Sequence, residues 1–148
     1  MNIIIGADHR GFAMKENLAV WLAEQGHEVS DVGALEMSEG DDYPDYAKLA
    51  AEKVAQDADN NRGILLCGSG VGMAVAANKV AGIRAANIRD VEIAKAARND
   101  DDINVLALGT DYVDLDDAKA IIATFLTTPF SGMDRHVSRI EKIKKMEK

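Results

Sequence analysis

The chain has 148 residues, of which 47% are hydrophobic and 28% are charged, and this balance predicts one soluble globular domain with a sizeable core. Its net charge of −8 argues against nucleic acid binding, which normally needs a basic surface. No apolar run is long enough to span a membrane, and Cys67 is the single cysteine, so we expect no internal disulfide and a cytoplasmic location.

Short runs rich in Ile, Val and Leu alternate with helical patterns along the chain. Buried strands are expected at residues 2–6, 28–32, 63–67, 83–86 and 105–108. Helices are expected before Gly26, from about Pro44, at 71–80, at 90–98, around 118–125, and at about 132–147. The second helix should bury Tyr46, Leu49, Ala50 and Val54, and the last should place Val137, Ile140 and Ile143 on one face.

Steady alternation of strand and helix implies right-handed crossovers and a parallel sheet with helices on both faces. We therefore expect residues 1–148 to form a single-domain, three-layer α/β/α Rossmann-like fold with a five-stranded parallel sheet. Ligand sites in such sheets lie beyond the carboxyl ends of the strands. This rule selects residues 7–11, 67–73 and Asn87.

The strongest chemical signal is Cys67 and the glycines that follow it. Gly68, Gly70 and Gly72 alternate with Ser69 and Val71 at the predicted start of a helix. Such a turn brings backbone N–H groups together, binds an anion, and favours the thiolate form of a nearby cysteine. A base beside an anion site is what proton abstraction next to a carbonyl requires.

Three other interpretations of this segment remain. A cysteine on a buried strand is usually a small inert hydrophobic residue. A dinucleotide-binding loop would explain Asp90 about 20 residues later, but the glycine spacing is G-x-G-x-G and follows the third strand instead of the first. A thiol hydrolase would need a His-Asn partner pattern, which is not obvious.

Asp8 and His9 follow the first strand, at the mouth of the expected cleft. An adjacent acid and imidazole could exchange protons with a cyclic sugar as its ring opens. The alternative is that Asp8 caps the next helix and that His9 is solvated.

Charged residues in two later segments are further candidates. Arg135 and Arg139 share a helical face beside His136, so both could bind one phosphate, although a solvated basic helix is the simpler interpretation. The acidic segment at 99–102, which includes Asp100 and Asp101, lacks the glycine turn and alternating ligands of a calcium loop. We interpret it as an acidic turn with one member facing the site, and we expect no metal.

With these motifs, the chain resembles the type B ribose-5-phosphate isomerase family, which includes the subunits of galactose-6-phosphate isomerase. The resemblance runs nearly end to end. It is carried by residues 5–12 (IGADHRGF), 42–45 (DYPD), 63–73 (GILLCGSGVGM), 76–85 (AANKVAGIRA) and 104–109 (NVLALG).

The resemblance implies a metal-free, cofactor-free aldose–ketose isomerase that works through a cis-enediolate and acts on a phosphorylated sugar. By the same resemblance, Cys67 is the base, Ser69 moves a proton between the sugar oxygens, and Asp8 and His9 open the ring. The remaining matches are Tyr43 in the cleft, an anion hole from Gly68 to Gly72, and a phosphate-binding segment with Arg135, His136 and Arg139. It also implies a homodimer or homotetramer with shared active sites, in which the last helix contacts a partner subunit.

Three segments depart from the family pattern. Asp100 and Asp101 stand where a His and an Asn are common, and Thr110-Asp111 replaces a segment that often holds a phosphate-binding Arg. The segment before Arg135 is one residue longer than usual. Asp111 beside a phosphate would weaken binding through like-charge repulsion, unless Arg135 and Arg139 suffice or the sugar differs.

Three functional hypotheses therefore remain. The first is isomerisation of ribose 5-phosphate to ribulose 5-phosphate. The second is isomerisation of another phosphorylated aldose, such as a tetrose 4-phosphate or a hexose 6-phosphate. The third is a non-catalytic sugar-phosphate-binding subunit, against which Cys67 and the intact glycine loop argue because a binder needs no base.

Overall fold

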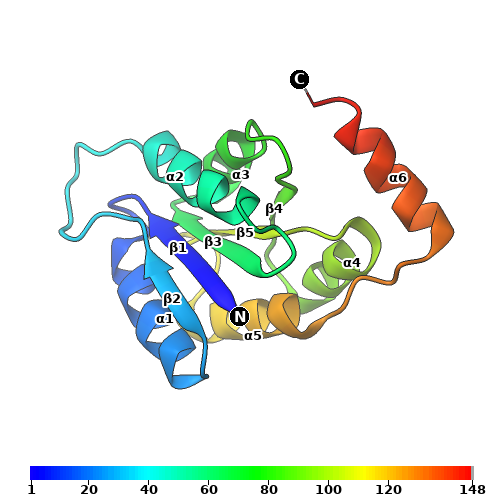
Figure 1. Cartoon of the computed structure of the whole chain (residues 1–148). Helices are drawn as coiled ribbons and strands as arrows, with labels where there is room; N and C mark the ends of the chain where they lie inside the picture. The colour runs from blue at the N-terminus through cyan, green and yellow to red at the C-terminus, as the bar shows by residue number, and fades with distance from the viewer. Residues whose placement is uncertain (148) are drawn as a thin grey trace.

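The computed structural model describes residues 1–147 and confirms the predicted five-stranded parallel sheet (Figure 1). Its strands are β1 (Asn2–Ala7), β2 (Glu28–Asp31), β3 (Asn61–Cys67), β4 (Ala85–Asn87) and β5 (Val105–Gly109). All neighbouring strands run parallel, in the order β2-β1-β3-β5-β4. The chain leaves β1 toward one edge and β3 toward the other, so the carboxyl ends of β1 and β3 flank the switch point where ligands bind in such sheets.

Six helices accompany the sheet in the described chain: α1 (Phe12–Glu24), α2 (Tyr43–Ala55), α3 (Val71–Ala77), α4 (Val91–Asp101), α5 (Leu115–Thr127) and α6 (Asp134–Lys144). Alternate strand residues point to opposite faces, which gives two cores. One core joins the sheet to α1, α4 and α5, and the other joins it to α2 and α3 (Figure 1). This arrangement is the predicted three-layer fold.

The predicted buried face of α2 is partly wrong, since Ala50 and Val54 are buried as expected but Leu49 is not. The buried side of α2 is formed by Ala47, Ala50, Ala51 and Val54, while Leu49 is 51% exposed. The small alanines let α2 pack closely on the sheet and on α3, and Leu49 falls outside their i, i+3, i+4 stripe. In α6, Ile140 is buried, but Val137 and Ile143 are largely exposed because within one chain this helix packs chiefly on α4.

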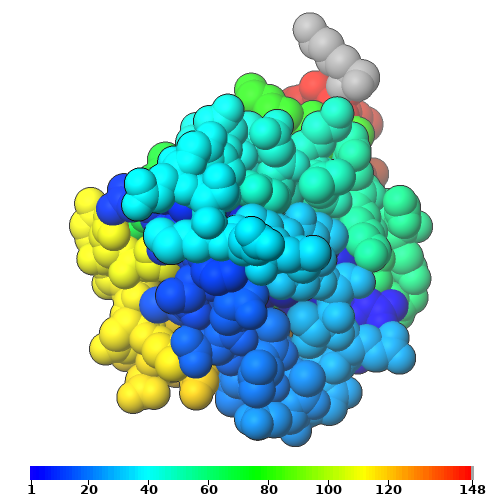
Figure 2. Space-filling model, turned by 90° about the vertical axis from the view of Figure 1, so that its left-hand side faces the viewer, coloured from blue at the N-terminus to red at the C-terminus, as the bar shows by residue number. Residues whose placement is uncertain are grey.

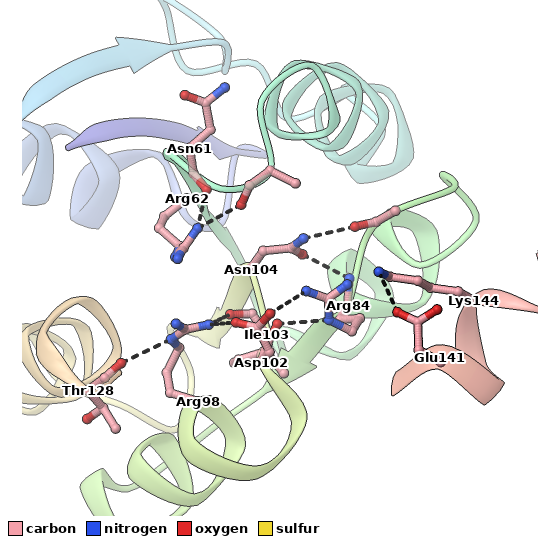
Figure 3. A network of polar contacts seen from close by, with 12 residues as sticks. Asn61, Arg62, Arg84, Arg98, Asp102, Ile103, Asn104, Thr128, Glu141 and Lys144 are labelled. Atoms are coloured by element: carbon pink, nitrogen blue, oxygen red, sulfur yellow. Dashed lines mark hydrogen bonds and ion pairs between the residues drawn. The ribbon is translucent and has the colours of Figure 1, made fainter. Parts of the chain in front are cut away.

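The acidic segment at 99–102 is also not the predicted turn. Helix α4 continues through Asp101, and Asp102 then ends it in a left-handed conformation with φ of 48°. The Asp102 carboxylate accepts hydrogen bonds from Arg98 at 2.7 Å and Arg84 at 3.0 Å (Figure 3). These bonds join the end of α4 to the segment that leads into β4, at the edge of the sheet opposite Cys67.

Helix α6 extends away from the sheet and lies beside α4 (Figure 1). Its basic residues at 142, 144 and 145 are exposed. None of the helices in residues 1–147 combines the length and the apolar character that crossing a bilayer would need.

Candidate active site

Cys67 ends β3, and its sulfur receives a hydrogen bond from the backbone of the glycine loop. The N–H of Gly70 donates to Sγ at 3.1 Å, and the Cys67 side chain is only 4% exposed. Gly70 has φ of +78°, a conformation that glycine adopts without steric cost, and this turn aims its amide at the sulfur. The Gly70 amide is thus a backbone donor placed directly at the sulfur.

Close packing explains two of the loop glycines. A Cβ on Gly70 would lie 2.6 Å from Oδ1 of Asn87, and one on Gly72 would lie 2.5 Å from the ring of Tyr43. The loop therefore passes directly between the end of β4 and the start of α2. The predicted cleft position of Tyr43 agrees with this contact.

The hydroxyl of Ser69 lies in the same loop. Its Oγ accepts the N–H of Val71 at 3.2 Å, which leaves the hydroxyl proton free to donate to a ligand. The Ser69 carbonyl accepts from Nδ2 of Asn87 at 3.1 Å, which ties the loop to β4.

Asp8 lies at the end of β1 and is buried. Its Oδ1 accepts the N–H groups of Arg10 at 3.0 Å and Gly11 at 3.2 Å. Asp8 does not cap α1, because the N-cap of this helix is Gly11 and no side chain caps it; Asp8 instead closes a turn just before the helix, and it also lines the pocket beside Cys67. The two roles are compatible because the second carboxylate oxygen receives no hydrogen bond from residues 1–147.

His9 is held by Asp41, a residue that the sequence analysis did not single out. Nδ1 of His9 lies 2.8 Å from Oδ1 of Asp41, and the backbone N–H of His9 donates to the same oxygen at 3.0 Å. An ionised carboxylate can only accept, so Nδ1 carries the proton and Nε2 is left free to accept one. Asp41 belongs to the loop between β2 and α2, and in Figure 2 the cyan atoms of this part of the chain lie next to the blue atoms of its N-terminal part.

The environment of Asp41 keeps it ionised. Burial raises its pKa, but hydrogen bonds from the ring and backbone of His9 and from the hydroxyl of Tyr46 outweigh burial, and the net pKa is lowered. Burial and the nearby Asp41 charge raise the pKa of Tyr46. Tyr46 therefore stays a neutral donor to the carboxylate, at 3.2 Å.

These residues surround one open pocket at the carboxyl edge of the sheet. It has a volume of about 510 Å³, within the range of small-molecule sites. Its lining consists of Asp8, Arg10, Tyr43, Cys67, Gly68, Ser69, Val71, Gly72 and Val75. The lining therefore includes the predicted residues of the first half of the chain except His9 and Gly70, and it adds Arg10 and Val75, which were not named as site residues.

The predicted residues of the second half lie elsewhere in this chain. Asp100 and Asp101 are at the end of α4, and Arg135 and Arg139 are exposed on α6. His136 is buried, with Nδ1 2.6 Å from Oγ of Ser131 and Nε2 3.7 Å from Oδ1 of Asp100. None of these five residues lines the pocket that residues 1–147 of the same chain form beside Cys67.

Asp8, His9 and Asp41 are the group in residues 1–147 that could hold a metal ion. One ligand atom from each lies within 4.8 Å of the other two. Most of their oxygens already have partners, since Oδ1 of Asp8 accepts two amides and Asp41 accepts three hydrogen bonds, although Oδ2 of Asp8 and Nε2 of His9 have none among residues 1–147. The geometry thus favours a structural cluster that orients His9, and the expected absence of a metal stays a prediction.

Comparison with known proteins identifies the family. The model of the Ribose/Galactose Isomerase family matches residues 3–143. The chain belongs to this family. The ribose-5-phosphate isomerase B of Escherichia coli (strain K12) is 43% identical over 145 residues, which cover 98% of this chain and 95% of that relative.

Solved structures of the Ribose/Galactose Isomerase family share the whole fold. Ribose-5-phosphate isomerase B from Mycoplasma genitalium, with bound ribulose-5-phosphate, gives a TM-score of 0.95 at 40% identity and covers 98% of this chain and 95% of its own. The type B enzyme of Trypanosoma brucei gives 0.93 at 45% identity, with coverage of 99% and 98%. The resemblance inferred from the motifs is therefore confirmed.

Proposed function

We propose that this chain interconverts ribose 5-phosphate and ribulose 5-phosphate. The observation that carries the proposal is the Cys67 sulfur with the Gly70 N–H at 3.1 Å, inside a pocket at the switch point of the sheet. The same fold, at 40% identity, holds ribulose-5-phosphate in the Mycoplasma genitalium relative. An aldose–ketose isomerase needs a base and an anion site side by side, and the pocket supplies both.

The proposed mechanism begins with ring opening by Asp8 and His9. The Cys67 thiolate then removes the proton from C2 of the open-chain aldose, and the C2–H electron pair forms the C1–C2 double bond of a cis-enediolate. Amides of the loop from Gly68 to Gly72 stabilise the enediolate oxygen, and Ser69 moves a proton from O2 to O1. The Cys67 thiol returns its proton to C1, which gives the ketose with no net redox change.

The proposed mechanism uses a second copy of the chain. Arg135, His136 and Arg139 would bind the phosphate of a substrate held in the pocket of the partner, in a homodimer or homotetramer with shared sites. The projection of α6 from the body supports this arrangement, since its arginines are exposed and reach no pocket residue of their own chain. Asp100 lies 3.7 Å from Nε2 of His136, so Asp100 and the adjacent Asp101 would lie next to the phosphate-binding residues of α6.

A different phosphorylated aldose is the second candidate. It is favoured by the three acidic residues Asp100, Asp101 and Asp111. By the resemblance drawn from the motifs, they stand where His, Asn and Arg are expected. A non-catalytic binding subunit is disfavoured, because a protein that only binds a sugar phosphate does not need a backbone amide directed at a cysteine sulfur. The cytoplasmic location stays a prediction.

A coupled assay of the purified protein tests the proposal. Ribose 5-phosphate, an aldotetrose 4-phosphate and an aldohexose 6-phosphate are compared by kcat/KM. The proposal expects ribose 5-phosphate to be preferred. Preference for another aldose would favour the second candidate, and inertness of all three with a folded protein would overturn the enzyme assignment.

A further inference from the structure

Arg10 places a positive charge at the mouth of the Cys67 pocket. It follows β1, and its guanidinium lies close to Gly68 at the start of the glycine loop. A Cβ on Gly68 would come within 2.4 Å of Cζ and Nη1 of Arg10 and within 2.8 Å of its Nε. The other residues that line the pocket carry no positive charge, so Arg10 is its cation within the described chain.

The loop after β5 holds this side chain in place. Nη2 of Arg10 donates to Oδ2 of Asp111, and the hydroxyl of Thr110 donates to the carbonyl oxygen of Arg10 at 3.1 Å. Nε and Nη1, the two nitrogens beside Gly68, have no acceptor among residues 1–147. A guanidinium anchored at one nitrogen and free at two others, beside an anion-binding loop, is arranged to accept a further anion.

The same contact changes the expected effect of Asp111. The sequence predicted that this carboxylate would repel a phosphate. In the structure its charge is paired with Arg10, so the two side chains together are neutral and Asp111 acts as an anchor. The pair joins the ends of β1 and β5 across the glycine loop.

Exposure indicates which end of a substrate Arg10 would meet. Cys67, where the enediolate forms, is 4% exposed, whereas the side chains of Arg10 and Asp111 are 52% and 43% exposed. A phosphate dianion is strongly hydrated and stays at the rim of a pocket while the reacting carbons enter it.

We propose that Arg10 binds the phosphate group of the substrate through Nε and Nη1, with Asp111 fixing Nη2. This inference rests on the proposed isomerase function for the position of the substrate. It adds a specificity-determining cation from the chain that also supplies Cys67. The phosphate would then be bound by Arg10 at the rim of the same pocket.

Steady-state kinetics of Arg10→Gln test the proposal. The expected result is a KM for ribose 5-phosphate raised about tenfold with kcat changed less than twofold, because the lost contact is the same in ground and transition states. The inhibition constant for inorganic phosphate should rise by a similar factor. Lys48→Gln removes an exposed positive charge from α2, outside the pocket lining, and should change neither constant by more than twofold.

Charge reversal of the pair gives a sharper test. Arg10→Asp alone places two carboxylates together, so KM should rise more than in Arg10→Gln. Adding Asp111→Arg returns a guanidinium to the same rim from the other strand, and KM should recover most of the loss. Both side chains are half-exposed, and thermal unfolding of each variant confirms that it folds.

Three results would overturn the inference: a KM of Arg10→Gln within twofold of wild type, an unchanged phosphate inhibition constant, or a double variant no better than Arg10→Asp. Failure of the proposed function would give a different result, namely a wild type that turns over no sugar phosphate.

In that case, calorimetric measurement of inorganic phosphate binding would still decide the role of Arg10. Equal affinity in wild type and Arg10→Gln would refute it.

Discussion

The Gly70 amide and the Cys67 sulfur form one unit, since the amide points at Sγ across 3.1 Å and the left-handed turn at Gly70 sets that direction. The turn also brings Gly70 within reach of Asn87, where no Cβ fits. Only proline would remove the backbone N–H, and proline cannot adopt the positive φ of Gly70, so a milder substitution has to change the direction of the amide instead. The geometry of this turn is therefore the accessible way to test the thiolate site.

Gly70→Ala should lower both stability and activity. The new Cβ meets Oδ1 of Asn87 at 2.6 Å and the backbone of Leu108 at 2.8 Å, and positive φ adds strain. We expect unfolding to become easier by about 2–4 kcal/mol and kcat to fall at least tenfold. Gly26→Ala is the matched control, because Gly26 has φ of +90° but open space around its Cβ. It should cost about 1–2 kcal/mol and leave kcat unchanged; equal losses in the two variants would contradict the account.

Asp41→Asn should change how stability depends on pH. The pKa of Asp41 is lowered in the folded protein, so the folded state binds fewer protons than the unfolded state in acid. Its stabilising contribution is complete above the unfolded pKa, near 3.8, and is lost as pH falls through the folded value. Urea unfolding from about pH 6 to pH 2 should show the gap between wild type and Asp41→Asn shrinking with acid.

The neighbouring Asp42 is the control for this measurement. It is exposed and its side chain makes no capping hydrogen bond. Asp42→Asn should track the wild type at every pH. A gap between wild type and Asp41→Asn that stays constant with pH would show that Asp41 stabilises by packing alone.

Much of the fold follows from local patterns. The apolar runs predict the five strands because parallel strands are buried on both faces, and the ends of β1 and β3 predict where the pocket lies. The face of α2 is predicted only in part, because Ala47 and Ala51 carry little hydrophobic signal and Leu49 carries much. The small alanines are buried and Leu49 is exposed because α2 approaches α3 closely, and this approach depends on tertiary packing.

Two site residues could not be predicted from spacing. Asp41 lies 32 residues from His9 in a long loop, and Asp111 lies 101 residues from Arg10. Neither separation corresponds to a helical or strand period, so only the folded path of the chain brings these pairs together. The position of α6 is likewise set by tertiary contacts, and its periodicity predicts a helix but not where its arginines lie.

Asp102 should be important for stability at the opposite edge of the sheet. The side chain of Arg98 is 5% exposed, and Asp102→Ala would remove the carboxylate that it shares with Arg84 (Figure 3). We expect a loss of about 3 kcal/mol by urea unfolding, since a buried charge is left without its partner. Asp102→Asn removes the negative charge but keeps a residue suited to φ of 48°. It therefore distinguishes a loss of stability caused by backbone strain from one caused by the missing charge.

Glu92→Ala, an exposed acid on the same helix, is the control for Asp102 and should change stability by less than about 0.5 kcal/mol. A loss of similar size in Asp102→Ala and Glu92→Ala would mean that the arginine cluster contributes little. A loss in Asp102→Ala that Asp102→Asn fully restores would assign the effect to backbone conformation.

Shared active sites can be tested by mixing two inactive variants. Cys67→Ala removes the proposed base and Arg139→Ala removes a proposed phosphate ligand. If each site takes Cys67 from one chain and Arg139 from the other, mixed dimers contain one intact site. Unfolding and refolding an equimolar mixture should then recover about one quarter of wild-type activity. No recovery, with dimers confirmed by light scattering, would place both residues in one chain.

Solvent deuterium exchange tests the proton transfer to Cys67 most directly. In D2O, the wild type should incorporate deuterium into ribulose 5-phosphate formed from ribose 5-phosphate, because the thiol can exchange its proton before returning it. Cys67→Ala should show isomerisation and exchange both reduced by about 10³-fold or more, while Cys67→Ser, which keeps the shape but not the acidity, stays within tenfold of the alanine variant. Exchange at the wild-type rate in folded Cys67→Ala would contradict the central claim that this sulfur removes the proton.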